Sequence, residues 1–299
     1  MLESTKFIDW KAIPMRFFFV HGGPGMNNCA EQALLGPLLS ARGHDAYFWN
    51  EPSRLRPSGD PFNPVGAFDG WVASLEHALA AFSHAGPVLL QAHCFATGPA
   101  IDVARRHPQR VAALVLTGPS PDPNAGLLRV LRLARQDMAS DQPEMALKLA
   151  DCLTRTRSLM DPAMHEAVGL ALNDQKLFTH YWADPAQFER SIAALMTPEA
   201  QFDAESFFAV IGDFAKRWPR PRRFDAPLTT PTLVVCGGRD PITPHTETLP
   251  GVLDEIPKAT ITVFEDAGHF VHLDRPERFV DTMLDWAARS VEAAVPSGR

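Results

Sequence analysis

The chain has 299 residues, and its 28 lysine and arginine residues face 35 aspartate and glutamate residues, which gives a formal charge of −7 at pH 7. This length suits one large α/β domain with an insertion, or two small domains. A net acidic protein repels phosphate backbones, so we expect no nucleic-acid partner.

Targeting and redox signals are few. The only early apolar run, Phe17 to Val20, is too short for a signal peptide or a membrane span. Cys29, Cys94, Cys152 and Cys236 match neither a zinc-ligand spacing nor a dense disulfide framework. We therefore expect a cytoplasmic protein with reduced thiols, no membrane partner, no metal and no cofactor.

Apolar runs bounded by Gly, Pro and Asp alternate with segments of helical period, which predicts an α/β fold. In chain order the predicted strands are Met15–Val20, Ala46–Trp49, Val88–Ala92, Ala112–Thr117, Thr232–Cys236 and Thr260–Phe264. Predicted helices around them include Trp71 to Phe82, a segment that starts right after Cys94 and runs to about Arg106, and Pro276 to about Val291. We expect a mostly parallel central sheet of about six to eight strands with flanking helices.

The character of the chain changes between the fourth and fifth predicted strands. Some five helices are predicted there, including Leu127–Met138, Met145–Thr154 and Phe207–Arg217, and no convincing strand. This pattern predicts a helical cap inserted at residues 121–228. The α/β core would then consist of residues 1–120 and 229–299.

The third predicted strand runs into the sequence Ala92-His93-Cys94-Phe95-Ala96. A buried strand, a sharp turn and a helix start form the layout of a nucleophile elbow, normally Gly-x-Ser-x-Gly. Alanine, the next smallest residue, stands where that motif has glycine. The N–H groups and dipole at a helix start favour an anion, here a thiolate. The alternative is a buried, inert thiol, which is the usual state of a free cysteine.

A glycine-rich loop, His21-Gly22-Gly23-Pro24-Gly25, follows the first predicted strand. Its backbone N–H groups can donate hydrogen bonds to a developing oxyanion. The spacing of its glycines matches neither the dinucleotide-binding fingerprint nor a Walker motif. A plain turn is the remaining alternative.

Two further residues follow late strands. Asp240 stands in Gly-Gly-Arg-Asp after the fifth strand, and His269 stands in Asp-Ala-Gly-His after the sixth. Alone, each is common as a turn aspartate or a surface histidine. Together with the glycine-rich loop and Cys94, however, they all lie at the carboxyl ends of strands, where open parallel sheets bind ligands.

The order of oxyanion loop, nucleophile, helical insertion, acid and histidine resembles the α/β-hydrolase superfamily over nearly the whole chain. The His-Gly-Gly-Pro-Gly loop resembles the proline iminopeptidase branch in particular. The resemblance implies that Cys94 is the nucleophile, His269 the base and Asp240 its partner. It also implies an oxyanion hole made by the N–H groups of Gly23 and Phe95.

Four neighbours of these residues are expected to line a substrate pocket: His21, Gly22, His93 and Phe270. Of these, His93 is also expected to pack behind the triad. The elbow departs from the proline iminopeptidase pattern, which has serine flanked by glycines and followed by tryptophan. A cysteine nucleophile has a precedent in the dienelactone hydrolases of the same superfamily.

The resulting hypothesis is an enzyme that transfers or hydrolyses the acyl group of an ester, thioester or lactone through a covalent acyl-cysteine. Its partner is a small-molecule acyl substrate. One alternative is a proline iminopeptidase-like aminopeptidase or amidase. Another is a receptor-like protein that binds a ligand on this fold, and a third is that Cys94 replaces an original serine. The sequence leaves open the substrate, the choice between hydrolysis and transfer, and the oligomeric state.

Overall fold

The computed structural model describes residues 15–52, 63–156, 161–174, 176–195, 197, 200–217 and 228–294. Six strands form one parallel sheet in the order β2-β1-β3-β4-β5-β6. They are β1 (Arg16–Val20), β2 (Asp45–Trp49), β3 (Val88–His93), β4 (Val111–Thr117), β5 (Thr232–Gly237) and β6 (Thr260–Phe264). Every predicted strand is present with ends that agree to within one residue, so the predicted α/β class with a parallel sheet is confirmed.

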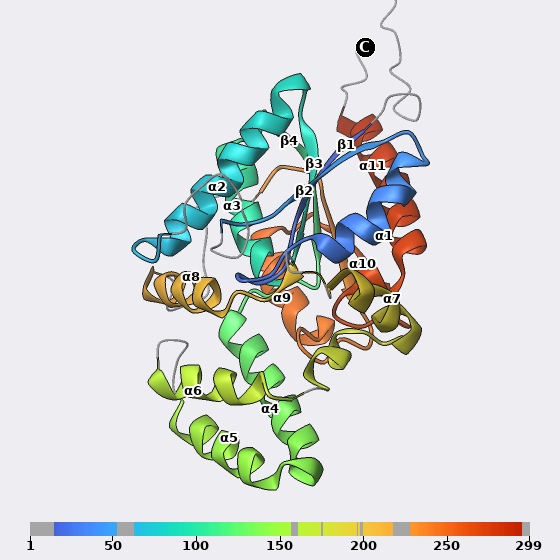
Figure 1. Ribbon diagram of the computed structural model, residues 1–299. Helices are drawn as coiled ribbons and strands as arrows, with labels where there is room; N and C mark the ends of the chain where they lie inside the picture. The colour runs from blue at the N-terminus through green and yellow to red at the C-terminus, as the bar shows by residue number, and fades with distance from the viewer. Residues whose placement is uncertain are drawn as a thin grey trace, which may run out of the picture.

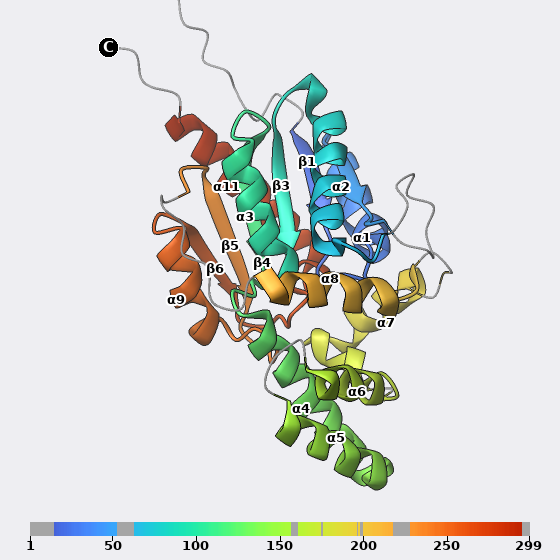
Figure 2. The ribbon, with the colours of Figure 1, turned by 90° about the vertical axis from the view of Figure 1, so that its left-hand side faces the viewer.

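Helices cover both faces of this sheet (Figures 1 and 2). Alternating residues of β1 show why, because Phe17 and Phe19 enter one apolar cluster while Phe18 and Val20 enter the other. The first cluster includes residues of α1 (Cys29–Ser40) and α11 (Pro276–Ala294), and the second those of α2 (Ala67–Phe82) and α3 (Thr97–Arg106). The other helical elements of the core are η1 (Ser83–Ala85), η2 (Cys94–Ala96), α9 (His245–Glu255) and α10 (Val271–Asp274).

The segment between β4 and β5 is helical in the part that the structure describes. It contains α4 (Pro123–Asp141), α5 (Pro143–Arg155), α6 (Pro162–Ala171), η3 (Leu177–Tyr181), α7 (Pro185–Leu195) and α8 (Ala204–Arg217). Asp122 and Asp161 accept hydrogen bonds from the first turns of α4 and α6, whose first residues are prolines. Helices α4, α5 and α6 project beyond the sheet, whereas α8 packs on α2 (Figure 2). Residues 218–227, in the predicted exit of the cap, lie outside the described residues.

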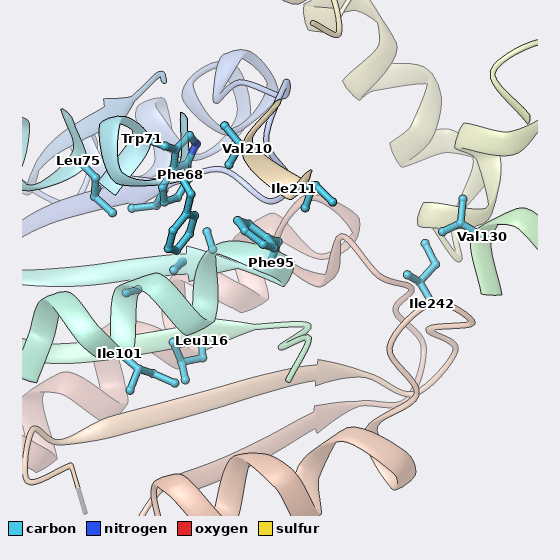
Figure 3. Packing of buried hydrophobic residues seen from close by; sticks show 14 of the residues in the cluster. Phe68, Trp71, Leu75, Phe95, Ile101, Leu116, Val130, Val210, Ile211 and Ile242 are labelled. Carbon is cyan, nitrogen blue, oxygen red and sulfur yellow. The ribbon is translucent and has the colours of Figure 1, made fainter. Parts of the chain in front are cut away.

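One apolar cluster runs from the sheet into these inserted helices. Figure 3 shows Val130 of α4 beside Ile242, which follows β5, and Ile211 of α8 near Phe95. The cap therefore packs over the carboxyl ends of the strands. None of the helices in the described ranges is both long enough and apolar enough to cross a membrane.

Candidate active site

Cys94 is the first residue of η2 and stands at a sharp turn directly after β3. Its φ of 50° is the only positive value at a non-glycine residue in the described part of the chain. Such a left-handed backbone conformation is costly for a residue with a Cβ atom, and it is typical of a strained nucleophile elbow. The side chain is only partly buried, whereas Ala92 and Ala96 on either side are completely buried. The two alanines thus fit the crowded positions that are glycines in the usual motif.

The glycine-rich loop, residues 21–25, lies against this elbow. The carbonyl of Gly22 accepts a hydrogen bond from the N–H of Ala96 at 3.3 Å. A Cβ atom at Gly22 would lie 2.7 Å from the His93 ring and 3.5 Å from the Cβ of Cys94. Only glycine permits so close an approach of the loop to the turn that carries Cys94.

His269 and Asp240 meet Cys94 at the ends of β6 and β5. The Nδ1 atom of His269 lies 2.8 Å from Oδ2 of Asp240, and His269 and Cys94 line the same cavity. Thr243 donates its hydroxyl proton to Oδ2 of Asp240 at 2.6 Å. The backbone N–H groups of Ile242 and Thr243 donate to Oδ1 at 2.7 and 2.9 Å. The carboxylate is therefore fixed by donors on both oxygens.

Charge at this site favours a protonated histidine. Burial by itself lowers the pKa of His269, but the negative charges of Asp240 and Cys94 and its hydrogen bonds to both raise that pKa to about 10. Burial likewise favours a protonated Asp240, yet the charge and hydrogen bonds of His269 and Thr243 hold its pKa below the usual value. At neutral pH the arrangement is thus suited to an ion pair of Asp240 with an imidazolium.

An apolar cavity of about 1020 Å³, open mouth included, lies between these residues and the cap. Gly22, Gly23, His93, Cys94, Phe95, His269 and Phe270 line its floor. Its upper wall comes from α4, α6, η3 and α8, with side chains that include Leu127, Val130, Val168, Leu177, Tyr181, Phe207 and Ile211. Among the described residues that line it, none is Asp, Glu, Lys or Arg.

A model of the α/β hydrolase fold family matches residues 16–276. The chain belongs to this family. It is 28% identical over 200 residues to 2-hydroxymuconate semialdehyde hydrolase of Pseudomonas putida, a match that covers 66% of this chain and only 60% of that enzyme. Similar solved structures include a proline iminopeptidase-related protein from Thermus thermophilus (TM-score 0.60, 20% identity, 93% and 91% of the two chains covered). A meta-cleavage product hydrolase from Pseudomonas fluorescens gives a TM-score of 0.59 at 19% identity, with 92% and 91% covered.

In this α/β hydrolase, three of the four expected pocket residues, Gly22, His93 and Phe270, lie at the cavity. His21 does not. Its ring stacks on Trp49 at 5.3 Å between centroids, and its Nδ1 lies 3.1 Å from the carbonyl of Gly23. With that geometry Nδ1–H donates to Gly23, so His21 supports the glycine-rich loop from behind rather than facing a substrate.

His93 and His272 lie behind His269. The His93 ring is 4.6 Å from that of His269 and 4.8 Å from that of His272, between centroids. Burial, followed by the charges of His269 and His272, lowers the pKa of His93 well below its ordinary value. His93 is therefore neutral and donates from Nδ1 to the carbonyl of Thr117 at 3.0 Å. His93 thus packs against the rings of His269 and His272.

Three residues of the site were not expected from the sequence. Thr243 had a usable signal, since a threonine three residues after a turn aspartate commonly bonds to it. Tyr181 reaches the cavity from η3, and its ring meets that of His269 at 5.5 Å. Glu51 is completely buried behind the glycine-rich loop. No local motif marks Tyr181 or Glu51 in the sequence. Their positions at the site depend on how the cap and the edge of the sheet pack.

Proposed function

We propose that the chain is a hydrolase or acyltransferase that acts on an apolar ester, thioester or lactone through a covalent acyl-cysteine at Cys94. The observation that carries the proposal is the strained cysteine elbow beside His269, whose ring is hydrogen-bonded to Asp240. Such an arrangement of histidine and acid can activate Cys94 as a nucleophile toward a substrate in the apolar cavity.

The reaction begins with the thiolate of Cys94 attacking the acyl carbonyl carbon. The π electrons of that carbonyl move to its oxygen, where the N–H groups of Gly23 and Phe95 donate hydrogen bonds. When the adduct collapses, the bond to the leaving group breaks, and His269 gives its proton to the departing alkoxide or thiolate. Asp240 stabilises the imidazolium before that step and holds the neutral ring in the correct tautomer after it.

Water, or an alcohol or amine as acceptor, then resolves the thioester. The neutral imidazole of His269 takes a proton from this nucleophile as it adds to the carbonyl carbon. Collapse of the second adduct releases the acid or the transferred acyl product. The thiolate and the imidazolium are restored, so the cycle is balanced without a cofactor.

Leaving-group chemistry favours esters and thioesters over amides. In the first adduct the Cys94 thiolate competes with the leaving group for departure. Alkoxides and thiolates leave more readily than an amine that has not been protonated. The apolar cavity favours an uncharged acyl chain, because each buried CH₂ contributes about 0.8 kcal/mol to binding.

An aminopeptidase needs a carboxylate that can bind the substrate's free amine. Three glutamates of the insertion, Glu144, Glu189 and Glu205, do not line the cavity. The described lining thus supplies no anion for a charged N-terminus. This supports the ester reading over the peptidase alternative suggested by the glycine-rich loop.

A side-by-side assay tests the substrate class. We expect hexanoyl and benzoyl thioesters to be turned over with kcat/KM at least about tenfold above the acetyl thioester, through added apolar burial. An adipoyl thioester, of the same chain length as hexanoyl but ending in a carboxylate, should be poorer than the hexanoyl substrate. Fast release from a prolyl arylamide that depends on its free amine, without thioester turnover, would contradict the proposal.

A further inference from the structure

The carboxylate of Glu51, two residues after β2, is completely buried and makes no contact with the cavity. Among the described residues, it accepts hydrogen bonds from three different parts of the fold. The backbone N–H of Gly25 donates to Oε1 at 2.7 Å, and the Ser206 hydroxyl donates to the same oxygen at 2.6 Å. The indole N–H of Trp71 donates to Oε2 at 2.6 Å. A core strand end, a core helix, the glycine-rich loop and the cap therefore meet at one buried carboxyl group.

The glycine-rich loop is bound to the cap a second time at Gly25. The N–H of Asp203, at the start of α8, donates to the carbonyl of Gly25 at 2.8 Å. A Cβ atom at Gly25 would lie 2.4 Å from the Asp203 carbonyl oxygen, and its φ of +78° also requires glycine. Both polar backbone groups of Gly25 are thus engaged, one with Glu51 and the other with the cap.

The glycine-rich loop that Glu51 holds also carries Gly23. Helix α8 in turn reaches the apolar cavity. Phe207, the residue after Ser206, and Ile211 both line the cavity. Ser206 itself is buried, with 1% of its surface exposed, and belongs to the side of α8 that faces the core. The contact between α8 and Glu51 therefore connects the cavity wall with the loop next to Cys94.

We propose that Glu51 and Ser206 are positioning residues that hold the glycine-rich loop, through Gly25, at the distance from Cys94 at which its N–H group receives the oxyanion. This inference rests on the proposed acyl chemistry. Donors to a developing oxyanion act only within a narrow range of distance, so a small displacement of the loop costs rate rather than binding. A buried carboxylate with three donors is a rigid anchor, and removal of one donor leaves its charge less well compensated.

The experiment separates reactions of Cys94 that need an oxyanion hole from those that do not. Acylation by a hexanoyl thioester passes through an oxyanion, whereas alkylation by iodoacetamide is a displacement at carbon without one. Ser206→Ala removes one donor to Glu51, and Glu51→Gln replaces the carboxylate by an amide of the same shape. Ser191→Ala is the matched control, because Ser191 is another completely buried cap serine, lies on α7, and does not line the cavity.

We expect Ser206→Ala to lower the acylation rate and kcat on the order of tenfold, with KM and the alkylation rate within about twofold of the parent protein. Glu51→Gln should show the same split with a larger loss, and Ser191→Ala should show none. Acylation at the parent rate in both Ser206→Ala and Glu51→Gln would overturn the proposal. A parallel fall of the acylation and alkylation rates would also overturn it, because it would indicate a general disturbance of the site around Cys94. If the parent protein is alkylated at Cys94 but never acylated, the proposed function fails as well. If the parent protein is acylated and the variants are unchanged, only the positioning role fails.

Discussion

Replacement of Cys94 by alanine should lower turnover of a hexanoyl thioester on the order of 10⁴-fold or more, because the atom that forms the covalent intermediate is gone. Initial rates at saturating substrate measure this effect directly. The oxyanion donors and the apolar cavity remain in the variant, so KM should change little. A small residual rate above that in water is expected from these remaining groups.

Two further cysteine variants make this result specific. Cys94→Ser keeps a weaker nucleophile at the same turn and should retain more activity than alanine. Cys152→Ala removes a buried thiol of α5 that does not line the cavity, and its kcat should equal that of the parent protein. Loss of activity in Cys152→Ala, with Cys94→Ala still active, would place the nucleophile elsewhere.

Asp240→Asn should lower kcat on the order of 10²-fold or more while leaving the fold intact. The charge of Asp240, together with that of Cys94, raises the pKa of His269 to about 10, against the effect of burial. Without that charge, burial should bring the pKa of His269 down, so the imidazolium that is present at pH 7 in the parent protein should be lost there. The asparagine amide can also bind the wrong tautomer of the ring.

Two measurements check this prediction. NMR titration of the His269 ring should show the proton leaving near pH 10 in the parent protein and at clearly lower pH in Asp240→Asn. Asp254→Asn, at an exposed position on α9, is the control and should change neither the titration nor kcat. An unchanged kcat in Asp240→Asn would mean that another acid orients His269 or that His269 is not the base.

The central strands were predictable because parallel strands covered on both faces are nearly continuous apolar runs. Helix α9 was harder to predict, since Pro250 lies inside it and proline normally ends a helix. Helix α1 also contains a proline, Pro37, and was not predicted either. In both cases packing on the sheet outweighs the local preference of the chain.

The core of the candidate site follows from the same regularity. In a parallel sheet, the residues after β3, β5 and β6 meet at one edge, so Cys94, Asp240 and His269 could be grouped before any geometry was known. The residues that support the glycine-rich loop could not be predicted from the sequence. Glu51 and Ser206 are 155 positions apart and meet only because α8 packs beside α2. His21 was predicted wrongly for the opposite reason. Its position next to the glycines in the sequence suggested a pocket residue, but in the fold its ring stacks on Trp49.

Trapping the intermediate tests the central claim most directly. The protein would be mixed with excess hexanoyl thioester, quenched in acid during steady-state turnover, and analysed by intact mass and peptide mapping. We predict one added hexanoyl group on the peptide that contains Cys94, released by neutral hydroxylamine and absent from Cys94→Ala. Asp240→Asn should carry the same adduct but form it more slowly. Sustained turnover with Cys94 unmodified and the acyl group on another side chain would contradict the account.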